Sequence, residues 1–160
     1  VLIGDALSSW KESFDIDYNL YKNISENIVP RFNIRLEKCL DHFCYNMKLD
    51  KLEISNCWYN IQQKGSLLKH HTHAGSIVTG AIFINVDENS SLFEVINPNM
   101  FCDYLVLKEL SEYTYGNFSF KPQIGKMILF PGYLKHGAPN INGTENRCVI
   151  SFNTQYEVNQ

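Results

Sequence analysis

The short spacing between strand-like segments is the feature that most limits how this chain can fold. From residue 52 onward, stretches rich in β-branched and aromatic residues follow one another with Gly, Pro or Asn between them. Parallel strands need a crossover of about a dozen residues or more, and most of these connections are too short. The pattern therefore favours an antiparallel sandwich or jelly roll. The expected strands are "LEISNCWYNIQQ", "SIVTGAIFINV", "SLFEVI", "NFSFKP", "GKMILFP" and "RCVISFNTQY".

The first third of the chain has the period of helices instead. Apolar residues recur every four positions between residues 17 and 29, and Pro30 ends that pattern. A second helix is expected from about Arg31 to Lys48, with His42 as an ordinary helix histidine. Its apolar stripe consists of Phe32, Leu36, Leu40, Phe43 and Met47. We therefore expect a single domain over residues 1–160, mainly β, with a helical N-terminal segment of about residues 1–50.

Composition limits the class of partner. The 160 residues carry 14 Lys plus Arg against 17 Asp plus Glu, a formal charge of −3, so no broad basic surface for nucleic acid is expected. The longest apolar runs are shorter than the ~20 residues of a membrane-spanning helix. The five cysteines are odd in number and stand among apolar neighbours, which suits reduced thiols. We expect a cytoplasmic protein with no membrane partner, and a homodimer is left open.

The stretch "LLKHHTHAGS" at residues 67–76 holds three of the five histidines. In an extended strand, His71 and His73 would project from the same face, because side chains alternate with a period of two. A pair of neutral imidazoles suits divalent iron, zinc or copper. His70 would point to the opposite face, so we expect it to be a surface or supporting residue rather than a ligand.

A third histidine and an arginine complete the candidate site. In "GKMILFPGYLKHGAPN" an apolar strand ends in Phe-Pro-Gly and His136 follows shortly after. His71, His73 and His136 would then occupy one face of an iron coordination sphere and leave other positions open. Arg147 follows eleven residues later at the start of an apolar strand, where a buried guanidinium would need a carboxylate partner. The alternative interpretation makes Arg147 a surface residue after the polar loop "NINGTEN".

The order of these motifs resembles the double-stranded β-helix dioxygenases that use iron and 2-oxoglutarate. It resembles more closely one family of 2-oxoglutarate/Fe(II) oxygenases that is frequent in phages and marine bacteria. The similar stretches are "CWYNIQQKG", "HTHAGS", "VTGAIFINV", "LFEVINP", "GKMILFPGYLKHGAPN" and "RCVISFN". The resemblance implies a cupin-like jelly roll in which His71, His73 and His136 bind Fe(II) and Arg147 holds the distal carboxylate of 2-oxoglutarate.

Further site residues follow from strand phase. Ser151 and Asn153 share the face of Arg147 if their strand is regular, so we expect them to hold the cosubstrate or line its pocket. On an earlier strand, Tyr59 or Asn60 is a candidate hydrogen-bond partner of the cosubstrate.

The leading hypothesis is an oxygenase of the hydroxylase type that consumes 2-oxoglutarate and O2. His73 stands where most such enzymes have Asp or Glu, which alters the charge and redox poise of bound iron. Two alternatives stay open: a three-histidine, cupin-like metal enzyme that does not use 2-oxoglutarate, and a non-catalytic jelly-roll module for binding or for a virion. The sequence does not identify the primary substrate, whose recognition is expected from the N-terminal helices and residues 97–117.

Overall fold

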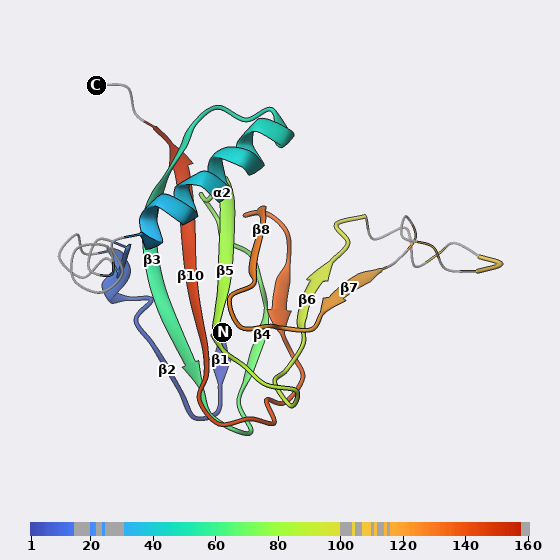
Figure 1. The fold of residues 1–160 in the computed structure, drawn as a ribbon. Coiled ribbons are helices and arrows are strands. Elements are labelled where there is room, and N and C mark those ends of the chain that lie inside the picture. The colour runs from blue at the N-terminus through green and yellow to red at the C-terminus, as the bar shows by residue number, and fades with distance from the viewer. Residues whose placement is uncertain are drawn as a thin grey trace.

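The computed structural model describes residues 1–14, 20, 21, 24, 31–99, 104, 107–109, 111, 114 and 116–157. Within these residues the chain forms ten strands, the α-helix α2 and the short 3-10 helix η1 (Figure 1). The elements are β1 Leu2–Ile3, β2 Ala6–Ser8, η1 Glu12–Phe14, α2 Phe32–Met47, β3 Leu52–Gln62, β4 Leu67–His71, β5 Val78–Asn85, β6 Phe93–Ile96, β7 Asn117–Phe120, β8 Met127–Pro131, β9 His136–Ala138 and β10 Arg147–Tyr156.

The strands form two five-stranded sheets with antiparallel pairing throughout. One sheet has the order β1-β4-β9-β6-β7 and the other has the order β2-β3-β10-β5-β8. Each sheet combines strands from both ends of the chain, so neither can form until distant segments meet. The expected antiparallel, mainly β architecture is confirmed.

The six strands expected from the sequence are all present, but four short strands were missed. These are β1, β2, β4 and β9, which have two to five residues each.

Because β1 and β2 lie within residues 1–8, the expectation of a helical segment over residues 1–50 is wrong there. Two or three residues are too few to display a period, and these strands form through pairing with β4 and β3. The helix expected over residues 17–29 lies outside the described residues except at positions 20, 21 and 24.

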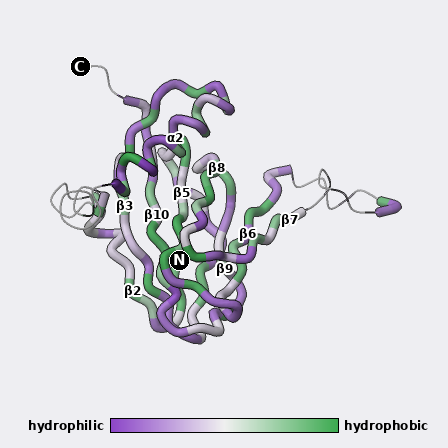
Figure 2. The backbone as a smooth tube through the Cα atoms, in the orientation of Figure 1, coloured by the Kyte–Doolittle hydropathy of each residue, from purple (hydrophilic) through white to green (hydrophobic). Residues whose placement is uncertain are grey.

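Helix α2 covers the outer face of the sheet that contains β3, β10 and β5 (Figure 1). Its bounds agree within one residue with the predicted Arg31–Lys48. The helix alternates between hydrophilic and hydrophobic residues (Figure 2), and it buries Leu36, Leu40 and Cys44. It ends where Lys48 adopts a left-handed backbone with φ 58° and donates its N–H to the carbonyl of Cys44. No helix among the described residues has the length and apolarity needed to cross a membrane.

Strand β10 separates two packing layers because its side chains alternate. Ile150 and Phe152 pack with Leu36 of α2, whereas Val149 belongs to the core between the two sheets. Three polar side chains of β10 line a cavity, and they are Arg147, Ser151 and Asn153. The apolar face of β10 thus anchors the strand on α2 while the other face is available for a site.

Candidate metal centre

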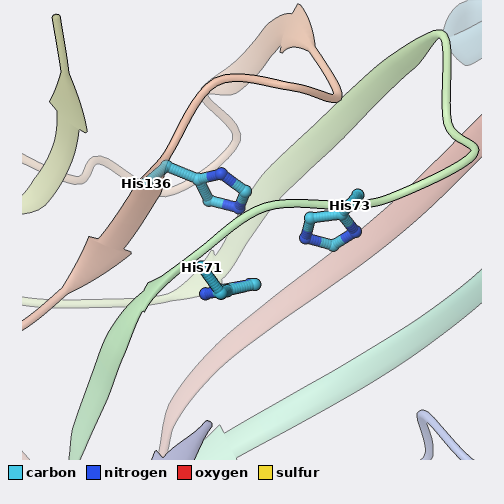
Figure 3. A group of neighbouring side chains, drawn as sticks. All are labelled: His71, His73 and His136. Carbon is cyan, nitrogen blue, oxygen red and sulfur yellow. The ribbon is translucent and has the colours of Figure 1, made fainter. Parts of the chain in front are cut away.

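Three histidines converge between the sheets. His71 ends β4, His136 begins β9, and the two residues are paired in the antiparallel register. His73 lies two residues beyond the end of β4. The ligand nitrogen atoms of the three imidazoles all lie within 4.8 Å of one another, and Figure 3 shows the rings gathered around one point. The structure therefore brings together the three histidines that the sequence singled out.

His71 and His73 both reach the cluster while Thr72 between them is exposed, as expected for two side chains that share a face. The chain turns at residues 74–75, just after His73, and the His73 N–H donates to the Gly132 carbonyl at 2.9 Å. A Cβ atom at position 132 would lie 2.3 Å from the carbonyl oxygen of Ser76, so only glycine allows this close approach. A turn held against the β8–β9 connection places His73.

Hydrogen bonds fix the orientation of each imidazole. Nδ1 of His71 and Nδ1 of His136 each lie 2.8 Å from the backbone carbonyl oxygen two residues earlier in the chain. Nδ1 of His73 lies 2.8 Å from Oδ1 of Asn153. Because these oxygens only accept, Nδ1 carries the proton in each ring and Nε2 keeps its lone pair. The three Nε2 lone pairs can therefore bind one divalent metal ion together.

Burial keeps these imidazoles neutral. His136 is 3% exposed and His73 is 9% exposed. Burial lowers the pKa of His136 to about 3 and that of His73 to about 4, and burial also lowers the pKa of His71. Protonated imidazole cannot bind a metal ion, so the shifts leave all three ligands competent at neutral pH. The residues present therefore fit a divalent transition metal.

Asn153 holds the ring of His73 through a hydrogen bond. Its Oδ1 accepts the His73 Nδ1–H at 2.8 Å and the Thr79 hydroxyl at 3.1 Å, and the residue is 7% exposed. From the sequence, Asn153 was expected on the face of Arg147, to hold the cosubstrate or line its pocket, and it lines the cavity. In the folded protein its carbonyl oxygen is engaged by the ring of His73.

A cavity of about 740 Å³ lies beside the three histidines, and Arg147 lines it. Arg147 is 2% exposed, so the interpretation of this residue as a surface arginine is wrong. Its Nη1 donates to Oε1 of Gln62, and its guanidinium carbon lies 5.7 Å from the ring centre of Phe83. Burial lowers the pKa of Arg147 to about 10, which leaves the side chain a cation at neutral pH. Among the described residues no carboxylate lies within ion-pair distance of it.

The remaining candidates divide by strand phase. Ser151 and Asn60 line the cavity. Tyr59 lies on the opposite face of β3, is 36% exposed and donates its backbone N–H to the Ser9 hydroxyl. Of the two candidates on β3, Asn60 therefore lines the cavity and Tyr59 does not. His70 faces Glu94, with 3.2 Å between Nε2 and Oε2, and stays outside the cluster of three.

Gln62 and Trp10 are among the cavity residues that were not predicted from the sequence. Gln62 lines the cavity with Trp58 and Asn60, and the spacing of two between these residues of β3 was a signal that could have found it. Trp10 had no such signal, because the pairing of β2 with β3 brings it to the cavity. Its ring packs edge-on against Trp58 with 4.3 Å between centroids, and Trp58 stacks on His73 at 5.6 Å.

Neutral imidazoles form a candidate metal site inside a two-sheet jelly roll, the architecture of the double-stranded β-helix class. The family described as "Putative 2OG-Fe(II) oxygenase" matches residues 56–153, which is more than half of the chain, and the chain belongs to this family. Fe(II) and 2-oxoglutarate are the cofactors of the family, in agreement with the resemblance noted in the sequence. Comparison with curated protein sequences finds no match.

Solved structures share the fold at low sequence identity. An oxidoreductase of the 2OG-Fe(II) oxygenase family from Burkholderia pseudomallei matches with a TM-score of 0.59 and 13% identity, over 84% of this chain and 55% of that one. A prolyl-4-hydroxylase from Pseudomonas putida matches with a TM-score of 0.52 and 10% identity, over 78% and 65%. HygX from Streptomyces hygroscopicus, solved with nickel, 2-oxoglutarate and hygromycin B, matches with a TM-score of 0.51 and 13% identity, over 77% and 64%. The double-stranded β-helix fold is confirmed, and the chain spans less than two thirds of the length of each of these structures.

Proposed function

We propose that this protein is a 2-oxoglutarate- and Fe(II)-dependent dioxygenase of the hydroxylase type. One observation carries the proposal: three imidazoles with available Nε2 atoms and the uncompensated cation of Arg147 line the same cavity. Such a cavity suits a ligand that has a metal-chelating group at one end and a carboxylate at the other. 2-Oxoglutarate has both groups.

The proposal gives each residue a physical task. His71, His73 and His136 hold iron through Nε2, and their Nδ1 hydrogen bonds keep the rings from turning. Arg147 binds the distal carboxylate, and Ser151 and Asn60 form part of the wall. When bound, iron and 2-oxoglutarate supply the oxidising chemistry, in which O2 is consumed, 2-oxoglutarate becomes succinate and CO2, and a substrate C–H bond becomes C–OH.

Charge supports an anionic cosubstrate. Three neutral imidazoles leave the positive charge of a divalent metal undiminished, and the buried guanidinium adds another positive charge to the same cavity. A dianion offsets most of this charge in a region where burial strengthens electrostatic attraction. An all-imidazole ligand set therefore makes the site more dependent on its anionic cosubstrate than a set that contains a carboxylate.

The second candidate is a three-histidine, cupin-like metal enzyme without 2-oxoglutarate. The all-imidazole ligand set favours this candidate, in which Arg147 would bind a carboxylate of the substrate. It predicts O2 uptake or turnover that does not depend on 2-oxoglutarate, whereas a non-catalytic jelly-roll module predicts neither.

Succinate formation tests the proposal. Protein reconstituted anaerobically with Fe(II) and 2-oxoglutarate is exposed to air, and succinate is followed by NMR. We expect succinate from the wild type, none above the metal-free blank from His136→Ala, and wild-type amounts from His42→Ala, which changes an exposed histidine of α2. Absence of succinate and of a 2-oxoglutarate-dependent visible absorption band at saturating iron would contradict the proposal.

Location and assembly belong to the same proposal. We expect a cytoplasmic protein, which cell fractionation would test. The mass in solution, measured by light scattering, would decide between a monomer and a homodimer.

A further inference from the structure

Gln62 and Arg147 form a buried pair in the wall of the cavity. The antiparallel register of β3 and β10 places them directly opposite each other. Gln62 is 1% exposed and Arg147 is 2% exposed, and both line the cavity. Arg147 Nη1 donates to Gln62 Oε1. Because a guanidinium can only donate, this contact fixes the amide with Oε1 toward Arg147 and Nε2 directed elsewhere.

Two donor atoms of this pair have no partner among the described residues. They are Nε2 of Gln62 and Nε of Arg147. Buried polar atoms in folded proteins nearly always have a hydrogen-bond partner. Two unsatisfied N–H donors in one cavity, one of them on the uncompensated cation of Arg147, indicate a ligand that supplies acceptor oxygens and negative charge.

We infer that Gln62 is a specificity-determining residue for the distal carboxylate of the cosubstrate. Its Oε1 orients the Arg147 guanidinium, and its Nε2–H donates to the carboxylate that Arg147 binds. The inference rests on the proposed function, because it takes 2-oxoglutarate as the ligand of this cavity.

The neutrality of the Gln62 amide is part of the inference. An amide positions the guanidinium without neutralising it, so the positive charge of Arg147 is left for the ligand. A carboxylate at position 62 would pair with Arg147, compensate its buried charge and repel an incoming dicarboxylate. The Gln62→Glu variant should therefore be more stable than the wild type without ligand and should bind 2-oxoglutarate more weakly. Because the new charge alone could produce both effects, the neutral Gln62→Met variant tests the contribution of the amide itself.

The experiment compares two oxo acids in the Fe(II)-loaded protein under anaerobic conditions. 2-Oxoglutarate has the distal carboxylate, and 2-oxovalerate has the same five-carbon length without it. Binding is followed by quenching of the two tryptophans of the chain, Trp10 and Trp58, which both line the cavity. Thermal melting of the ligand-free protein is measured in parallel.

The expected effects separate the charge of residue 62 from its shape. Gln62→Glu should weaken 2-oxoglutarate binding by about 100-fold and change 2-oxovalerate binding by less than about threefold. Gln62→Met keeps the length of the side chain without its polar atoms, and should weaken 2-oxoglutarate binding by about tenfold. The matched control is Gln63→Glu, because the amide of Gln63 donates to Asn146 Oδ1 at an exposed position, and both affinities should stay within about twofold of the wild type.

Each outcome has one meaning. If the wild type binds neither oxo acid, the proposed function is overturned, and this inference with it. If the wild type binds 2-oxoglutarate and Gln62→Glu binds it equally well, the inference alone is overturned. A Gln62→Glu variant that melts at a lower temperature and loses both oxo acids alike would also overturn the inference. Gln62→Met is the independent check, because a variant that binds 2-oxoglutarate as tightly as the wild type would contradict a role of the amide.

Discussion

Asn153 offers a way to perturb the metal centre without changing a ligand. Asn153→Ala removes the oxygen that accepts the His73 Nδ1–H at 2.8 Å and the Thr79 hydroxyl at 3.1 Å. The ring of His73 is then free to turn or to move its proton to Nε2, the nitrogen that a metal needs. Loss of such a supporting partner lowers metal affinity by about 10- to 100-fold, which corresponds to about 1.4 to 2.7 kcal/mol. Each buried donor left unsatisfied also lowers the free energy of unfolding by about 1–3 kcal/mol.

A competition titration against a chromophoric chelator, with Zn(II) as an air-stable probe, measures the affinity, and urea unfolding measures the stability. Asn56→Ala is the matched control. Asn56 is the strand partner of Asn153 in the β3–β10 register, is 4% exposed and donates to the Ser13 hydroxyl at 3.0 Å. We expect both variants to lose stability and only Asn153→Ala to lose metal affinity. Equal metal affinities in the two variants would refute the role of Asn153 in holding His73.

Three further predictions concern stability and the limits of the site. Unfolding of the metal-free protein in urea should become easier by about 4 kcal/mol from about pH 7.5 to about pH 5. Burial lowers the pKa values of His73 and His136 from the ordinary 6.5 to about 4 and about 3. At these two histidines, only the unfolded chain therefore takes up protons as the pH falls through 6.5. An unfolding free energy that does not change over this pH range would contradict the prediction. Gly80→Ala places a Cβ atom 2.1 Å from the Phe152 ring and should lower the unfolding free energy by about 1–3 kcal/mol. Adding Phe152→Leu to Gly80→Ala should recover part of this loss. If the effects of the two substitutions on the unfolding free energy simply add, the contact is contradicted. His70→Ala should leave Zn(II) affinity unchanged because the His70 ring faces Glu94. A large loss of Zn(II) affinity would show instead that His70 is a metal ligand.

The long strands could be predicted because their side-chain period is readable. The expected strand "RCVISFNTQY" coincides with β10, Arg147–Tyr156, since ten residues show which positions face the core and which face the cavity. The same phase correctly placed Ser151 and Asn153 on the face of Arg147. It could not identify the partner of Asn153, because His73 approaches from a segment 80 residues earlier in the chain.

His73 could be identified from the local pattern, but the contact that holds it could not. Strand alternation predicted that His73 would share a face with His71, and both side chains reach the cluster although β4 itself ends at His71. The N–H of His73 bonds to Gly132, and Gly132 in turn must pass close to Ser76. A contact between two turns far apart in sequence leaves no local pattern.

The short edge strands and the wall of the cavity lay beyond sequence reasoning for a related reason. Strand β2 has three residues, and its pairing of Ala6 with Gln62 is set by β3. This pairing brings Trp10 into the lining of the cavity. Gln62 had the correct phase on β3, but a glutamine at a strand end is ordinary until its register with Arg147 is known.

Diffraction from crystals of the Fe(II)-loaded protein, recorded on both sides of the iron absorption edge, would locate the metal directly. The structure predicts a single strong anomalous peak about 2 Å from Nε2 of each of His71, His73 and His136, with the three Nδ1 hydrogen bonds unchanged. A peak at another position, or iron bonded through Nδ1 with these hydrogen bonds broken, would contradict the metal centre.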